Sequence, residues 1–185
     1  MTHEQWEFVI GVNLWGVVHG LQAFLPGMVE RDEGHVVNTA SVAGLVVAPG
    51  AANYSATKHA VVGLSEALFR ELAAAGSNVG ISVLCLAAVD TDILRAERNW
   101  PAHLGPAPEA RQVADGEIQG LKQADEVAAE VFQAIADRQF WILTHAEQFA
   151  DALRGRAEGM IAGRNPDDSS VDPNFRNAHG SLAPQ

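Results

Sequence analysis

Apolar residues recur along the chain with two different periods, and the changes of period mark alternating helices and strands. Residues 3–24 carry apolar side chains nearly all round a helix, and Pro26 and Gly27 are predicted to end it. Three further helices are predicted over residues 52–75, 123–138 and 146–163. Short β-branched or continuously apolar runs predict buried strands over residues 35–40, 79–85 and 140–144. This alternation predicts an α/β fold with a parallel sheet and right-handed crossovers.

The remaining segments have no such period. Residues 93–120 are rich in proline, glycine and charge and predict a long insertion. Residues 164–185 are rich in asparagine, aspartate, proline and serine, a composition typical of frayed chain ends. We therefore expect one domain over residues 1–163 and a flexible tail over residues 164–185, which fits a chain of 185 residues.

Composition narrows the classes of function. The chain has 48% hydrophobic residues, 12 Lys and Arg against 23 Asp and Glu, and a net charge of −11. These values exclude a disordered chain and argue against nucleic acid or an anionic membrane as partner. The single cysteine, Cys85, excludes a disulfide framework, and the histidines lack metal-ligand spacing, so we expect no metal. The apolar stretches are interrupted well short of the roughly 18 residues of a membrane span, and residues 1–5 lack the basic region of a secretory signal. We therefore expect a cytoplasmic protein with no membrane span.

Candidate chemistry centres on the only tyrosine. Tyr54 stands four residues before Lys58, one of two lysines, so the two side chains share one face of the predicted helix. A lysine ammonium one turn away favours the phenolate and lowers the tyrosine pKa from its usual value of about 10. Ser41 follows directly on the predicted strand 35–40, where ligands bind in open α/β sheets. The three side chains have the parts of a general acid/base for a carbonyl or alcohol oxygen. Because Tyr-x-x-x-Lys is a common spacing, the alternative is a tyrosine and a lysine on a solvated helix.

The stretches around these side chains resemble a known family. They are VNLWG (residues 12–16), VVNTASVAG (36–44) and YSATKHAVVGL (54–64). They are similar to the patterns V-N-x-x-G, V-N-x-S-S-x-A-G and Y-x-A-[ST]-K-x-A-[VL]-x-G-[LF] of the classical short-chain dehydrogenases/reductases. The interval of 13 residues from Ser41 to Tyr54 also matches the family. The resemblance extends over most of residues 4–163.

The resemblance implies a hydride transfer between NAD or NADP and a carbonyl or secondary alcohol substrate. It assigns proton exchange to Tyr54, and it gives Lys58 the tasks of lowering the tyrosine pKa and binding the nicotinamide ribose. Ser41 would hold the substrate oxygen. Asn13 would hold a water that connects Lys58 to solvent. The alternative for Asn13 is structural, as a side chain that caps or hydrogen-bonds a buried helix.

The same resemblance assigns the loop after strand 79–85 to the cofactor. Thr91 would contact the nicotinamide carboxamide, so Val89 and Thr91 join Tyr54 and Lys58 in the cofactor-binding set. The alternative for Thr91 is an N-cap of the segment that follows. The loop departs from the family pattern, because Ala87-Ala88 stands where the family has Pro-Gly.

A larger departure concerns the glycine-rich loop T-G-x-x-x-G-x-G, which receives the dinucleotide pyrophosphate in the family and occurs nowhere in this sequence. The residue that reads the adenosine ribose is absent too, so the sequence does not choose between NAD and NADP. We therefore expect the C-terminal part of a doubly wound parallel-sheet Rossmann-type domain, missing the first strands and the glycine-rich loop.

The family pairs its subunits through the helices predicted here at 3–24 and 52–75, which implies a homodimer or homotetramer. The insertion 93–120, with Trp100 and Leu104, is expected to close over a small substrate. Two alternatives stand beside the enzyme. One is a non-catalytic remnant that acts as an interaction module or needs a partner chain, and the other is a reading frame that was started too late.

Overall fold

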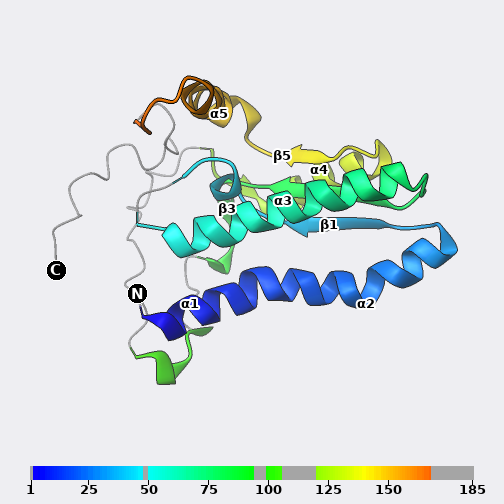
Figure 1. Cartoon of the computed structure of the whole chain (residues 1–185), viewed down its shortest axis with the longest axis horizontal. Helices are drawn as coiled ribbons and strands as arrows, with labels where there is room; N and C mark the ends of the chain where they lie inside the picture. Colours follow the sequence, from blue (N-terminus) through cyan, green and yellow to red (C-terminus); the bar gives the residue numbers. More distant parts are fainter. Residues whose placement is uncertain (1, 48–49, 94–98, 106–119, 168–185) are drawn as a thin grey trace.

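The computed structural model describes residues 2–47, 50–93, 99–105 and 120–167 (Figure 1). Its helices are α1 (His3–Ile10), α2 (Gly16–Arg31), α3 (Ala52–Ala74), α4 (Ala124–Ala136) and α5 (Ala146–Ile161). Shorter turns are the π-helical η1 (Gly11–Trp15) and the 3-10 turns η2 (Val42–Gly44) and η4 (Ala102–Leu104). The strands are β1 (His35–Thr39), β2 (Gly80–Cys85), β3 (Val89–Asp90), β4 (Lys122–Gln123) and β5 (Trp141–Leu143). Every predicted helix and strand has a counterpart among them.

Three of the strands form one parallel sheet in the order β1-β2-β5. Val36 of β1 pairs with Ile81 of β2, and Leu84 of β2 pairs with Ile142 of β5. The central strand β2 is buried along its whole length. Successive side chains of a strand point to opposite faces, and α3 and α4 cover the two faces of β2. The predicted α/β fold with a parallel sheet is confirmed.

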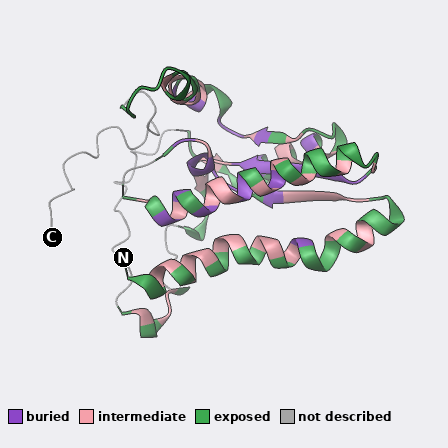
Figure 2. Cartoon of the chain, in the orientation of Figure 1, coloured by how far each residue is buried: buried purple, intermediate pink, exposed green. Residues whose placement is uncertain are grey.

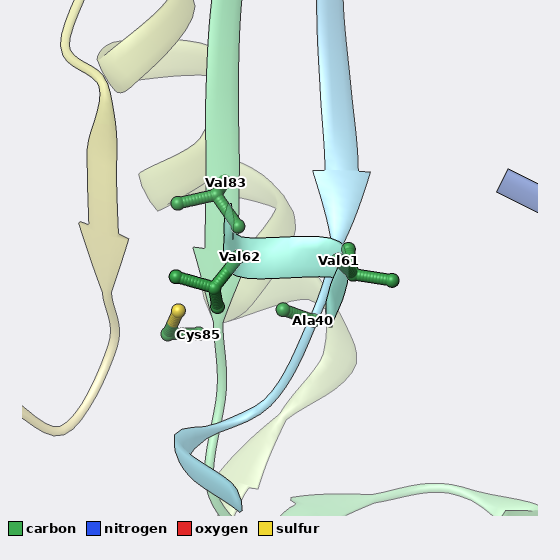
Figure 3. Packing of buried hydrophobic residues seen from close by; sticks show 5 residues of the cluster. All are labelled: Ala40, Val61, Val62, Val83 and Cys85. Atoms are coloured by element: carbon green, nitrogen blue, oxygen red, sulfur yellow. The ribbon is translucent and has the colours of Figure 1, made fainter. Parts of the chain in front are cut away.

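Two of the three buried clusters that form the core lie on either side of this sheet. Between α3 and the sheet, a cluster of small and β-branched side chains is buried (Figure 3), made up of Ala40, Val61, Val62, Val83 and Cys85. Between α4 and the sheet lie Leu84, Val127, Ala134 and Ile142. Figure 2 shows that burial is concentrated in the sheet and in η2, whereas α1 and α2 consist mainly of intermediate and exposed residues. The single cysteine is therefore a core residue, as expected.

The first helix is longer than predicted. α1, η1 and α2 follow one another without a break from His3 to Arg31, so the prediction that Pro26 and Gly27 end the helix is wrong. A proline removes one backbone hydrogen bond, but the next turn is held by tertiary contacts. The Met28 side chain lies against Gly34. Asp32 ends the helix in a left-handed conformation (φ 51°), and its carboxylate accepts hydrogen bonds from Ser77 and Asn78.

This helical stretch also corrects an expectation about membranes. His3–Arg31, 29 residues long, is long and apolar enough to cross a bilayer, although the sequence was expected to hold no such stretch. Length and composition are the whole of that criterion, and core helices of soluble proteins satisfy it as well. The exposed apolar side chains on this stretch include Val12, Trp15 and Phe24.

The ends of the predicted insertion 93–120 are held together by a strand pair that periodicity did not predict. β3 pairs in parallel with β4, and Val89 lies opposite Lys122. Trp100 packs edge-on against Phe8 of α1, with ring centroids 5.4 Å apart. Residues 94–98 and 106–119, and residues 168–185 of the predicted tail, lie outside the described residues.

Candidate active site

Ser41 is fixed where the chain leaves the end of β1. Its backbone is extended, and its hydroxyl accepts a hydrogen bond from the Ala43 amide, 3.1 Å away, so that Ser41 N-caps η2. The same hydroxyl donates to the Leu86 carbonyl at the end of β2, 3.4 Å away. The serine is 7% exposed. Ser41 is thus held over the carboxyl ends of the two strands where ligands of open α/β sheets bind.

A glycine lets η2 and α3 approach each other closely. A Cβ atom at Gly44 would lie 2.7 Å from the Lys58 carbonyl oxygen and 2.9 Å from Cγ2 of Val62. Distances this short are not found for real side chains, so only glycine fits here. This close approach sets how far Ser41 stands from the first turns of α3.

Tyr54 and Lys58 lie together in those first turns, as their spacing predicted. The lysine Nζ atom lies 5.6 Å from the centroid of the Tyr54 ring. It donates a hydrogen bond to the carbonyl oxygen of Thr39, the last residue of β1, at 3.1 Å. Both side chains are half-buried, so the reading of a tyrosine and a lysine on a solvated helix does not fit the structure.

The pKa shift of Tyr54 differs from the one expected from its spacing to Lys58. Burial raises the pKa of Tyr54 above that of free tyrosine, and a hydrogen bond with the Ser41 side chain acts in the opposite direction. Burial also lowers the pKa of Lys58, against the effect of the nearby Cys85. The lowering of the tyrosine pKa by Lys58 is not seen. The ammonium group lies over the ring and bonds to Thr39, while desolvation acts on the phenol directly.

Asn13 is brought to α3 by the π-helical turn η1. Its Nδ2 atom donates to Oγ1 of Thr57 at 3.2 Å, and Thr57 in turn donates to the Tyr54 carbonyl oxygen at 2.8 Å. The structure therefore places all four predicted catalytic side chains, Asn13, Ser41, Tyr54 and Lys58, around the start of α3. For Asn13 it shows the hydrogen bond to a helix that was the structural alternative.

The two remaining cofactor-binding candidates follow β2 at the same edge of the sheet. Val89 is half-buried in β3, and Thr91 is exposed. The Thr91 hydroxyl accepts a hydrogen bond from the Ile93 amide at 3.4 Å, as expected of an N-cap. A contact with a ligand would have to share this hydroxyl.

Thr57 is a residue of the site that the sequence did not single out. It is 2% exposed, and it links Asn13 to the turn that carries Tyr54. Its position inside the YSATK stretch was the only signal in the sequence. Among the described residues, no cluster of three or more His, Cys, Asp or Glu side chains is placed to hold a metal ion.

Comparison with models of known protein families shows which family this chain belongs to. The model, described as short chain dehydrogenase, matches residues 1–102, more than half of the sequence. The chain belongs to the short-chain dehydrogenase family. Because the match begins at residue 1, the N-terminal helix is part of the matched region.

Members of the family resemble this chain over most of its length. A short-chain dehydrogenase/reductase from Burkholderia phymatum, solved in complex with NAD, is 41% identical, with a TM-score of 0.81 over 90% of this chain and 62% of that one. A short-chain dehydrogenase from Sphingobium yanoikuyae, solved with NADPH, has a TM-score of 0.63 at 24% identity, covers 89% of this chain and 59% of its own, and shows the fold alone.

A curated relative, the CLA biosynthesis dehydrogenase/reductase of Lactiplantibacillus plantarum, is 29% identical over 178 residues. That match covers 90% of this chain and 62% of the relative. The chain therefore spans just under two thirds of the length of these relatives, and it shares their Rossmann-like α/β architecture.

Proposed function

We propose that this chain is an oxidoreductase whose Tyr54 exchanges a proton with a carbonyl or secondary alcohol oxygen during hydride transfer with NAD or NADP. The observation that carries the proposal is the placement of Ser41 and Tyr54. Ser41 stands at the carboxyl end of β1, where its side chain lowers the pKa of the Tyr54 phenol, and Lys58 lies beside the tyrosine ring. An oxygen that both hydroxyl groups reach would be held and protonated at one place.

The protonation states support a donor role for the tyrosine near neutral pH. Burial keeps the phenol of Tyr54 protonated, and a protonated phenol can give its proton to a carbonyl oxygen as negative charge develops there. The Ser41 side chain lowers the pKa of the phenol, and it would stabilise the phenolate that remains by turning its proton from the Leu86 carbonyl to the phenolate oxygen. The nicotinamide, when bound, supplies or accepts the hydride.

The residues at the carboxyl edge of the sheet fit the nicotinamide end of a dinucleotide. The Lys58 ammonium has three N–H donors, and its bond to the Thr39 carbonyl uses one of them. The others are suited to ribose hydroxyl groups. Val89, in β3, and Thr91 both follow β2 in the chain, where they would contact the nicotinamide. The choice between NAD and NADP stays open, because the relatives solved with cofactor hold one or the other.

A second candidate is a chain that needs a partner polypeptide to complete its fold. β1 is an edge strand of the described sheet, and such an edge offers unpaired backbone groups to another strand. Beside it, α2 exposes apolar side chains such as Phe24 and Val29. This candidate follows from the prediction that the first strands and the glycine-rich loop are missing from this chain. That statement stays a prediction.

A cofactor titration separates the two candidates. The 185-residue chain is titrated with NADH and with NADPH while the fluorescence of its four tryptophans is followed. Saturable binding would support the oxidoreductase and refute the second candidate, a chain that needs a partner polypeptide to complete its fold. With a panel of small aldehydes and ketones, Tyr54→Phe should lower kcat by about 10² to 10⁴ while leaving circular dichroism unchanged. An active Tyr54→Phe variant would refute the assigned acid/base.

The expected assembly is a homodimer or homotetramer through the helices at 3–24 and 52–75, with a small-molecule substrate and neither nucleic acid nor membrane as partner. The exposed Val12, Trp15 and Phe24 of the first helix support this, because apolar surface of this kind is usually covered in a stable protein. Light scattering from the purified chain tests it, and a strictly monomeric mass would count against it. The cytoplasm remains the predicted location.

A further inference from the structure

The hydroxyl group of Thr57 lies between two groups of the candidate site. It donates its single proton to the Tyr54 carbonyl oxygen at 2.8 Å. A hydroxyl has no second proton, so toward Asn13 it can only accept. The asparagine must therefore present its NH₂ end, which lies 3.2 Å from Oγ1. The direction of the Asn13 amide, with Oδ1 turned away from Thr57, follows from how Thr57 uses its proton.

Burial makes this constraint strict. Thr57 is 2% exposed, so no bulk water is available to the hydroxyl if the amide turns round. A reversed amide would place Oδ1 against the hydroxyl oxygen, and the two acceptors would repel each other unless Thr57 withdrew its proton from the Tyr54 carbonyl. The π-helical turn η1 supplies the other half of the constraint, because it holds the Asn13 backbone opposite this point of α3.

The same helix carries a second copy of this arrangement away from Tyr54. Ser65 donates to the Val61 carbonyl oxygen at 2.7 Å and accepts from Nδ2 of Asn38 at 3.0 Å. Both members of this pair are buried, and neither contacts the Tyr54 turn through a hydrogen bond that the structure records. The Ser65 pair therefore offers a matched structural control for the Thr57 pair.

We propose that Thr57 is a positioning residue that fixes the direction of the Asn13 amide and leaves its Oδ1 atom as the acceptor for the active site. The orientation follows from the two hydrogen bonds of Thr57. Its effect on turnover rests on the proposed function and on the role that the family resemblance gives Asn13, that of holding a water which connects Lys58 to solvent.

The orientation is tested without any activity measurement. In a ¹⁵N-labelled chain, the side-chain amide of Asn13 is assigned as the NH₂ pair that disappears in Asn13→Ala. Thr57→Val should shift this pair toward solvent-like positions and speed its exchange with water, and Thr57→Ser should restore both values. An unchanged pair in Thr57→Val would overturn the proposal.

The catalytic consequence is tested with NADH or NADPH and the best substrate of the aldehyde and ketone panel. Thr57→Val should lower kcat about ten-fold with little change in KM, because it disturbs the placement of a proton-transfer group and not substrate binding. Thr57→Ser should recover most of the loss. Ser65→Ala should destabilise the fold yet keep kcat. Equal losses of kcat in Thr57→Val and Ser65→Ala would refute a positioning role.

A variant of Asn13 gives a test that leaves the buried threonine intact. Asn13→Asp offers only acceptors to Thr57 when ionised, but its protonated form can donate. Its kcat should therefore be low near neutral pH and rise relative to wild type as the pH falls, whereas Asn13→Ala should show no such rise. A pH-independent ratio for Asn13→Asp would overturn the proposal. If wild type shows no turnover, the proposed function fails, and the amide spectra still decide the orientation.

Discussion

The Lys58 ammonium lies over the Tyr54 ring, 5.6 Å from its centroid, and is tied to β1 by a hydrogen bond to the Thr39 carbonyl. The lysine is thus held by the strand and the ring together, with donors left for a ligand. A half-buried positive charge therefore stands at the carboxyl edge of the sheet.

Removing that charge should weaken cofactor binding. Lys58→Met is expected to raise the Kd for NADH about 10- to 100-fold, because charge-assisted hydrogen bonds to ribose hydroxyl groups would be lost. Lys122→Met is the matched control, since the only other lysine forms an ion pair with Glu130 on α4. Fluorescence titration measures both, and equal weakening by the two substitutions would contradict the assignment of Lys58.

The ionisation of Tyr54 can be followed directly, because it is the only tyrosine. Burial raises its pKa, so less than half of the phenol should be ionised at pH 10 in the folded protein, as read from phenolate absorbance. Since the folded pKa lies above the unfolded one, this group contributes stability that is present below about pH 10 and is lost as the pH rises through the folded pKa.

Ser41 should modulate that titration. Its hydrogen bond with the phenol lowers the tyrosine pKa, so Ser41→Ala should raise it further. Ser55→Ala is the control, because Ser55 is a buried serine next to Tyr54 whose hydroxyl has no hydrogen-bond partner among the described residues. A Ser41→Ala variant whose tyrosine titrates like wild type would show that the two hydroxyl groups do not interact.

The close approach at Gly44 predicts a specific sensitivity. Gly44→Ala should destabilise the fold by about 1–3 kcal/mol, because its methyl group would overlap the Lys58 carbonyl and Val62. It should also reduce turnover by moving Ser41 away from α3. Gly159→Ala, in α5 with no atom within 4 Å of the added carbon, should instead be neutral or stabilising by up to about 1 kcal/mol. Urea unfolding compares the two, and similar values would contradict the packing argument.

A histidine at the other end of the sheet predicts how stability depends on acid. Ser82 donates to the Gln139 carbonyl at 2.6 Å, so His35 must donate to Ser82 from Nε2, 2.7 Å away. Burial and the nearby Arg138 lower the pKa of His35. Because the pKa of His35 is lower in the folded protein than in the unfolded chain, His35 contributes stability that is fully present above about pH 6.5. This stability is lost as the pH falls through the folded-state pKa.

The test is urea unfolding on both sides of that range. Wild type should lose stability between neutral pH and about pH 5, and His35→Gln, which keeps a donor for Ser82 but does not titrate, should lose less. His103→Gln is the control, because that histidine is exposed on η4. The same loss of stability in His35→Gln as in wild type would assign the acid sensitivity to other groups.

The helices and strands that could be predicted are those whose pattern of apolar residues is visible within one continuous segment. The strands at 80–85 and 141–143 were recognisable because they are apolar over consecutive residues, and Tyr54 and Lys58 because a helix brings residues four apart together. What could not be predicted depended on distant residues. α2 continues past Pro26 because Met28 and Asp32 are held by residues from other segments, and the two-residue strands β3 and β4 are too short to show a period.

In the candidate site, too, features set by nearby residues could be predicted, whereas features set by distant residues could not. The sequence predicted that Ser41, Tyr54 and Lys58 lie together, and the structure places them around the start of α3. Their pKa shifts could not be predicted, since desolvation depends on what covers Tyr54. The link from Asn13 to Thr57 spans 44 positions and runs through a π-helical turn, which shifts the residues that follow it away from ordinary helical spacing.

The position of Cys85 has a practical consequence. This only thiol of the chain is wholly buried at the end of the central strand, next to Lys58, and burial raises its pKa to about 12. A thiol in that state does not react with an alkylating reagent until the strand comes away from its neighbours. The labelling rate of Cys85 in native buffer, divided by the rate in urea, therefore measures how often the sheet opens beneath the candidate site.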